Sequence, residues 1–294
     1  MNRVDTFNDQ RPLLFSIAYR MLGSVMDAED MVQETFLRWQ DAPVDDVRSP
    51  KSYLSTVVTR LCIDQLRSAR AQREQYIGPW LPEPLITEET AQIDENLALA
   101  DSLSMAFLVM LERLSPLERA AFLLREVFDY PYPEIATIID KSEANCRQMV
   151  HRAREHINAG ESRFEPSPGE IEQISARFMK ATTEGDMDAL IALLTEDVTV
   201  WSDGGGKVAA ALNPVYGPQK VARFFVKLAA KMPADTAMRL VRVNERPGFI
   251  VWMGGHVDFV AEVSFRDGLI DALRIVRNPD KLRHVPATLG RVSS

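Results

Sequence analysis

Two residues of the C-terminal half, Asp203 and His256, carry the side chains best suited to general acid–base chemistry. A carboxylate and an imidazole that line one pocket can move protons to and from a substrate. Asp203, however, begins the run Asp-Gly-Gly-Gly-Lys207, which a Gly-rich turn explains, and His256 lies on an expected strand beside Gly254-Gly255. Because no spacing pairs the two groups, we interpret both positions as structural and predict no catalytic residue.

The other motifs of this kind predict neither a cofactor nor a metal site. The run 203–207 lacks the spacing of a phosphate loop and a Ser or Thr after its lysine, which favours a structural or domain-contact loop. His151 and His156 are five positions apart and do not share a helix face. Cys62 and Cys146 form no CxxC motif, which fits a reducing cytoplasm. No apolar stretch is long enough to span a membrane, and no secretory signal is visible.

Charge is distributed unevenly along the 294 residues. The net charge of −8 alone argues against a nucleic-acid-binding protein. Yet Arg48–Arg73 contains six basic residues and one acid, and Lys141–Arg154 contains four basic residues and one acid. Glu74–Asp101 contains seven acids and no base, and Asp27–Asp46 contains seven acids and one base. This segregation predicts two short basic surfaces for phosphates and acidic surfaces for a different partner.

Three helices are predicted before residue 74. Amphipathic periodicity indicates the first two, over Phe7–Tyr19 and Asp27–Trp39. Ser49-Pro50 begins the third, which continues to about Arg73. On this helix one face is apolar, and three arginines lie nearly opposite it: Arg60, Arg67 and Arg70.

A helix-turn-helix is predicted between residues 115 and 157. Ser115-Pro-Leu-Glu118 is a capping box that begins a helix. Pro133 begins a second helix, and Ser142 caps a third that ends near Ile157. A short helix, a tight turn and a basic following helix are typical of DNA-binding helix-turn-helix units.

A proline-rich segment and a domain boundary lie outside these helices, and the residue pattern changes after the boundary. Tyr76–Pro84 contains three prolines and cannot be regular helix, and its aromatic side chains need a surface to lie on. Ala159–Gly169 is the clearest domain boundary. The pattern that follows predicts an α+β domain with a curved antiparallel sheet. Its expected helices cover 170–184, 187–194 and 218–231, and its expected strands cover 198–202, 248–253, 256–265 and 269–276.

The N-terminal motifs resemble those of extracytoplasmic-function (ECF) sigma factors, in the same order. Asp27–Arg38 resembles region 2.2, Ser52–Arg67 resembles the region 2.3–2.4 helix, and Leu114–Glu126 with the helix-turn-helix ending in His151–Arg154 resembles region 4. The resemblance implies a region 2 helical bundle that opens and reads the −10 element of promoter DNA, and a region 4 that reads the −35 element. It also implies binding to the clamp helices and flap of the large subunits of core RNA polymerase.

The resemblance also assigns site residues by position. Those facing polymerase are Asp30, Gln33 and Glu34, and those facing the −10 element are Arg60, Arg67 and Arg70. In the recognition helix, the residues directed to the −35 element or its phosphates are Asn145, Arg147, Gln148, His151, Arg152 and Arg154. Glu143 and Met149 depart from many relatives, so no −35 sequence preference is carried over.

Residues 170–290 resemble the SnoaL-like domain, a cone-shaped fold shared with polyketide cyclases and ketosteroid isomerase. Three short motifs, 80–84, 203–207 and 278–282, resemble those of an ECF subgroup that carries this domain as a fused extension. We therefore expect the first motif to dock on the domain near the other two and to regulate the protein without a separate anti-sigma factor. The residues concerned are Trp80, Leu81, Pro82, Glu83, Pro84, Asp203, Lys207, Asn278, Pro279, Asp280, Lys281 and Leu282.

The sequence thus predicts a multidomain chain with two all-α sigma domains and an α+β SnoaL-like domain. The expected parts are region 2 (1–73), an acidic linker (74–102), region 4 (103–158), a second linker (159–169) and the C-terminal domain (170–294). The predicted function is that of an alternative sigma factor. Three alternatives stay open: a merely solvated acidic face, an ordinary repressor, and a SnoaL-like enzyme or small-ligand sensor fused to a DNA-binding module.

Overall fold

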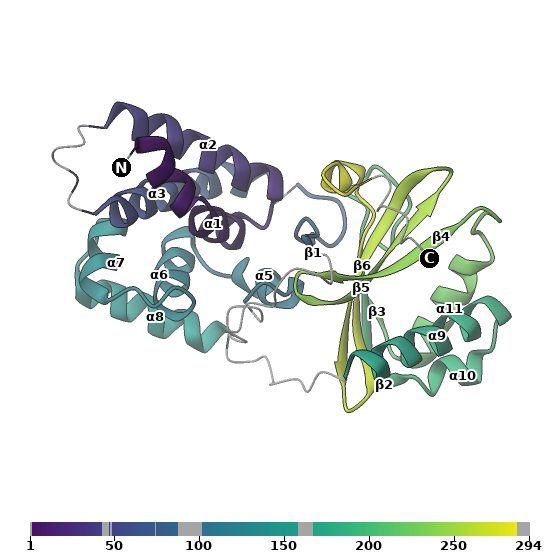
Figure 1. Ribbon diagram of the computed structural model, residues 1–294. Helices are drawn as coiled ribbons and strands as arrows, with labels where there is room; N and C mark the ends of the chain where they lie inside the picture. Colours follow the sequence, from purple (N-terminus) through teal and green to yellow (C-terminus); the bar gives the residue numbers. More distant parts are fainter. Residues whose placement is uncertain are drawn as a thin grey trace. The chain divides into compact units, whose positions relative to one another are not determined.

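The computed structural model describes residues 2–42, 47, 49–73, 75–87, 102–157 and 167–286 (Figure 1). The chain divides into two compact units. Unit 1 comprises residues 1–75 and 94–161, and unit 2 comprises residues 76–93 and 162–294. Arg48 and much of the acidic stretch 74–101 lie outside the described residues. No helix in the described part of the chain is long and apolar enough to cross a membrane.

Three long helices form the first part of unit 1: α1 (Arg3–Leu22), α2 (Val25–Asp41) and α3 (Pro50–Arg73). Gly23 ends α1 in the left-handed conformation, with φ of 66°, and its N–H donates to the Tyr19 carbonyl. Ser24 then caps α2, because its side chain accepts from the Asp27 N–H. Trp39 is buried, and its indole N–H donates to the Arg3 carbonyl at 3.0 Å. The first turn of α1 is thereby fastened to the end of α2.

Four shorter helices follow in the described part of unit 1: α5 (Met105–Leu111), α6 (Pro116–Glu126), α7 (Tyr132–Ile139) and α8 (Glu143–Ile157). The predicted capping box of Ser115 and Glu118 begins α6. Asp140, with φ of 54°, makes the tight turn between α7 and α8. Arg119 of α6 is buried and donates to the Met21 carbonyl of α1 at 2.6 Å, so the two groups of helices share one packed unit.

Unit 2 contains a mixed sheet with three helices on one of its faces (Figure 1). The helices are α9 (Pro168–Glu184), α10 (Met187–Ile191) and α11 (Pro218–Ala229). The strands are β1 (Ile86–Thr87), β2 (Leu194–Asp203), β3 (Val215–Tyr216), β4 (Ala237–Val243), β5 (Arg246–Met253), β6 (His256–Arg266) and β7 (Leu269–Val276), with 3₁₀-helix η2 at Pro279–Leu282. Their order in the sheet is β1-β4-β5-β6-β7-β2-β3. Alternate residues of β5 and β6 pack in the core beneath the helices, as the period of a strand requires.

The α+β class is confirmed, but several local predictions about unit 2 were wrong. The expected helix over 187–194 ends at Ile191, and Leu194 already begins a strand. The sheet is not wholly antiparallel, because β2 pairs in parallel with β7. Strands β1, β3 and β4 were not expected. The two-residue strand β1 exists only as a partner of β4, with Ile86 opposite Val243.

Candidate nucleic-acid interface and a docked segment

Helix α8 buries one face and exposes the other, as its spacing predicted. Cys146, Val150 and Ala153 are at most 1 % exposed. The N-terminus of α8 is capped by Ser142, whose hydroxyl accepts from the Asn145 N–H at 3.3 Å. All six predicted DNA-facing side chains are exposed: Asn145, Arg147, Gln148, His151, Arg152 and Arg154. This face can reach the edges of bases in a major groove, where Arg and Gln discriminate between them.

Two of these arginines are held by neighbours. Arg154 makes two hydrogen bonds to the Glu126 carboxylate, at 2.8 and 3.2 Å, and these bonds raise the pKa of Arg154. Arg147 pairs with Glu143 at 3.0 Å, and its guanidinium carbon lies 4.4 Å from the centre of the Tyr132 ring. Both side chains nevertheless remain about half-exposed, at 51 % for Arg154 and 55 % for Arg147.

The three arginines of α3 have different surroundings. Arg60 donates to the carbonyls of Ile138 and Thr137, at 2.8 and 2.9 Å, at the C-terminal end of α7. Arg67 is exposed and pairs with Asp64 at 3.2 Å. The side chain of Arg70 lies outside the described residues. The structure thus places Arg60 against the helix-turn-helix and leaves Arg67 facing outward.

Helix α2 carries the residues predicted to meet polymerase. Asp30 and Gln33 are exposed, and Glu34 is 42 % exposed in its side chain, where it pairs with Arg38 at 2.9 Å. Two large apolar side chains, Met26 and Leu37, are also exposed, at 47 % and 49 %. At 100° per residue, positions 26, 30, 33 and 37 share one stripe of the helix. This stripe lies opposite the buried residues Ala28, Val32, Thr35 and Trp39.

A second site lies within unit 2, where residues 76–87, here called the docked segment, lie along the C-terminal domain. Asp203, at the end of β2, is fully buried. Its carboxylate accepts from the Tyr76 hydroxyl at 2.6 Å and from the Leu81 N–H at 2.9 Å. It also accepts from the Gly205 N–H at 3.0 Å and from Lys281 at 2.8 Å. One buried carboxylate therefore connects the docked segment, the Gly-rich loop and η2.

Lys281 balances the charge of Asp203. Its ammonium lies 4.8 Å from the centre of the Tyr76 ring and 4.4 Å from that of Trp80, and it also donates to the Leu81 carbonyl. The side chain of Lys281 is 9 % exposed. A buried ammonium needs such partners, because removing it from water is costly. The two aromatic residues of the docked segment thus cover the lysine of the domain.

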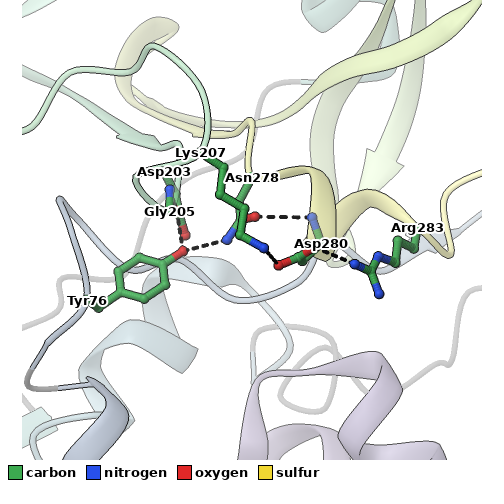
Figure 2. Close-up of polar contacts among 7 residues, drawn as sticks. All are labelled: Tyr76, Asp203, Gly205, Lys207, Asn278, Asp280 and Arg283. Atoms are coloured by element: carbon green, nitrogen blue, oxygen red, sulfur yellow. Dashed lines mark hydrogen bonds and ion pairs between the residues drawn. The ribbon is translucent and has the colours of Figure 1, made fainter.

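Asn278 and the glycines complete this site (Figure 2). The Asn278 amide donates to the Tyr76 hydroxyl at 2.9 Å. Burial, and then the hydrogen bond to Asp203, raise the pKa of Tyr76, so its hydroxyl stays a donor. Gly205 has φ of 57°, and a Cβ there would lie 2.2 Å from the Asn278 amide nitrogen. A glycine is required at this position both by the backbone and by the close approach.

The outer part of the site is more exposed. Lys207 pairs with Asp280, which also accepts from Arg283 at 2.6 Å (Figure 2). The hydrogen bond from Lys207 is the largest cause that lowers the pKa of Asp280. Pro279 is exposed, whereas Leu282 is buried. Ion pairs at such positions contribute little to stability, so this part orients η2 rather than fastening it.

The remaining motif residues are buried: Leu81, Pro82, Glu83 and Pro84. His284 contacts this stretch, because its Nε2 lies 2.7 Å from the Pro84 carbonyl and its Nδ1 lies 3.9 Å from Glu83. Asn244 exchanges two hydrogen bonds with Leu85, at 2.8 and 3.0 Å. Sequence reasoning missed His284 and Asn244, because no local pattern marks either as a partner of a segment so far away in the chain.

The space between sheet and helices in unit 2 is filled by apolar side chains. Phe178 of α9 meets Phe225 of α11 edge to face, with ring centres 4.9 Å apart, and Phe249 and Phe259 extend the cluster along the sheet. His256 is exposed at the start of β6, and Asp203 is occupied by the contacts above, so the structure does not bring them together as an acid–base pair. In the described ranges, no group of three or more His, Cys, Asp or Glu side chains could hold a metal ion.

Known proteins resemble both parts of the chain. The family described as Sigma-70 region 2 matches residues 6–72, and Sigma-70, region 4 matches residues 104–157. "ECF RNA polymerase sigma factor SigJ" of Mycobacterium tuberculosis is 38 % identical over 296 residues, covering 96 % of this chain and 94 % of that protein. "Probable ECF RNA polymerase sigma factor SigI" of the same species is 32 % identical over 282 residues, covering 95 % and 94 %. The crystal structure of M. tuberculosis SigJ matches with a TM-score of 0.77 at 35 % identity, covering 97 % of this chain and 100 % of that one.

Proposed function

Because the chain belongs to the ECF RNA polymerase sigma factors, we propose that its C-terminal domain controls, through the docked segment, the transcription that it initiates. Sigma factors bind core RNA polymerase and promoter DNA, and the polymerisation chemistry is the core enzyme's. This chain therefore needs no catalytic residue for initiation. We place it in the cytoplasm, with the polymerase.

The polymerase contact is assigned to the exposed stripe of α2. Asp30 and Gln33 lie between the exposed apolar side chains of Met26 and Leu37 on this stripe. An acidic centre with apolar ends suits a basic protein surface that also offers an apolar contact, whereas DNA would repel the carboxylates. We infer that Asp30, Gln33 and Glu34 meet the clamp helices of polymerase.

The DNA contacts are assigned to α8 and α3. Arg147 and Gln148 read base edges of the −35 element, and Arg152 binds phosphate. Arg67 and Arg60 face DNA around the −10 element. The two elements are about 25 base pairs apart, or roughly 85 Å along B-DNA at 3.4 Å per base pair. Because Arg60 hydrogen-bonds to the end of α7, both elements cannot be read until α3 and α7 separate.

One observation supports control of initiation by the C-terminal domain: buried Asp203 contacts both the docked segment and the rest of the domain. In the sequence, the docked segment lies between the parts that match region 2 and region 4. The contacts of Asp203 with Tyr76, Leu81 and Lys281 hold this connection on unit 2. A connection that is held can span less distance than a free one, so docking limits how far the two DNA-reading parts separate. A shift of a few kcal/mol in docking is enough to change the population of separated molecules.

Transcription with purified core RNA polymerase on a pool of genomic promoter fragments tests this proposal. The full-length chain should produce transcripts with defined start sites from a subset of fragments, and core enzyme alone should produce none of them. The variant Asp203→Asn should select the same fragments but at changed rates, because it alters docking and not the DNA-reading residues. Initiation from no fragment would contradict the sigma function. Unchanged rates for the variant would contradict control of initiation by the C-terminal domain.

A further inference from the structure

The ring of Tyr132 lies at the N-terminus of α7, and two arginines of region 4 contact it. The guanidinium carbon of Arg147 is 4.4 Å from the ring centre and that of Arg125 is 5.3 Å from it. Tyr132 itself is half-buried, and the prolines on both sides of it, Pro131 and Pro133, restrict its backbone. The ring is therefore a fixed surface, in contrast to the flexible side chains that lie on it.

Arg147 is restrained from two directions. The Tyr132 ring attracts the guanidinium through its π face. The Glu143 carboxylate, one turn earlier in α8, pairs with the same guanidinium at 3.0 Å. Glu143 is one of the positions at which the sequence departs from many relatives, and its pairing with Arg147 explains what this carboxylate does. The side chain of Arg147 nevertheless remains 55 % exposed, so it stays accessible to DNA.

We propose that Tyr132 is a positioning residue that sets −35 specificity by holding Arg147 in the orientation in which it reads a base pair. The inference rests on the base-reading role of Arg147 proposed above. A free arginine has many rotamers, and ordering it on binding DNA costs free energy that a preorganised one does not lose again. Two parallel N–H donors discriminate between bases only when their plane is aligned with the base edge.

Arg125 has a different part in the same cluster. It donates to the Tyr130 carbonyl at 3.1 Å and pairs with Asp129 at 3.2 Å, and its side chain is 33 % exposed. These contacts hold Arg125 to the loop before α7. We therefore assign no base-reading role to Arg125.

A double-mutant cycle in the full-length chain, assembled with core polymerase, tests the proposal. The probes are a fragment that initiates in the experiment above and its single base-pair changes across the −35 element. The readout is the ratio of initiation on the original fragment to that on each changed fragment. Arg147→Ala should lower this ratio at one or two base pairs by about five-fold or more. Tyr132→Leu should lower it at the same base pairs by about two- to five-fold, the range expected for an exposed cation–π contact.

Two further variants separate positioning from structure. Tyr132→Phe keeps the ring and should keep the ratio of the wild type. Tyr132→Leu in the Arg147→Ala background should cause no further loss of the ratio, because the residue through which it acts is gone. Tyr216→Leu, an exposed tyrosine of β3, is the matched control.

The outcomes distinguish the two levels of the argument. If Arg147→Ala leaves every ratio unchanged, the base-reading role of Arg147 fails, and the positioning role fails with it. If Arg147→Ala lowers the ratio but Tyr132→Leu does not, the positioning role alone is overturned. It is also overturned if Tyr132→Leu reduces initiation equally on all fragments, or lowers the ratio as much in the Arg147→Ala background.

Discussion

At the scale of residues, Asp203 and Lys281 form a buried ion pair of unit 2. Both side chains are at most 9 % exposed, and each has further hydrogen bonds. Asp203→Asn leaves the buried ammonium of Lys281 without its counter-charge, which typically costs about 3–5 kcal/mol. Denaturant unfolding of unit 2 in the full-length chain should show a loss of this size. Asp280→Asn, which breaks an exposed pair, should cost about 0–1 kcal/mol.

Equal losses of unfolding free energy for Asp203→Asn and Asp280→Asn would contradict the assignment of Asp203 and Lys281 as a buried, stabilising pair.

The buried position of Asp203 could not have been predicted from its local sequence. The run of three glycines indicates a turn correctly, and the positive φ of Gly205 confirms it. Burial of the carboxylate arises from Tyr76 and Lys281, which come from distant parts of the chain.

Recognition-helix residues should divide into base readers and phosphate binders. Gln148→Ala should weaken binding to a matched −35 duplex by about 1–3 kcal/mol more than to a scrambled one, because Gln reads an adenine edge. Arg152→Ala should weaken binding to both duplexes similarly and should flatten the dependence of log K on log salt by about one unit. Titrations of both duplexes at several salt concentrations measure these effects. Equal losses on both duplexes for Gln148→Ala would remove it from the base readers.

At the scale of elements, α2 should act as a polymerase-binding surface. The double variant Asp30→Lys/Glu34→Lys places positive charge on the stripe and beside it, and should weaken binding to core polymerase at least ten-fold through repulsion from a basic surface. Binding of the same variant to −35 DNA should not weaken. The control Glu172→Lys changes an exposed acid of α9 and should leave polymerase affinity unchanged. Titration of core polymerase with labelled chain measures this affinity. A double variant that binds polymerase as tightly as the wild type would contradict the assignment of α2 as the polymerase-binding surface.

The helices were easier to predict than the strands, for physical reasons. In α8 the period of 3.6 residues and the Ser142 cap are local, and they place Cys146, Val150 and Ala153 in the core correctly. In contrast, Ala237–Val243 carries two arginines that interrupt the apolar pattern, and its pairing with β5 and β1 decides its conformation. Leu193 and Leu194 continue the apolar pattern of α10, so periodicity could not mark where strand β2 begins.

At the scale of the whole molecule, two truncations should have different effects. Ending the chain after Gly169 removes Asp203 together with the entire surface on which residues 76–87 lie, and leaves this segment free. Ending it before Asn278 leaves Asp203 in place but removes Lys281, so the carboxylate is buried without a cation. Initiation by these two chains should therefore change by different amounts on the same promoter. Identical rates for both would show that the contacts of η2 have no separate role.

The central claim, that docking of the segment controls initiation, is tested most directly by one rate. This rate is that of open-complex formation on a single promoter, measured for full-length wild type, Asp203→Asn and the matched exposed control Asp235→Asn. Hydrogen exchange of the Leu81 amide, which donates to Asp203, verifies undocking in the same samples. The account predicts faster Leu81 exchange and a several-fold change in rate for Asp203→Asn, with neither change for Asp235→Asn. Faster Leu81 exchange in Asp203→Asn with the open-complex rate of the wild type would contradict it.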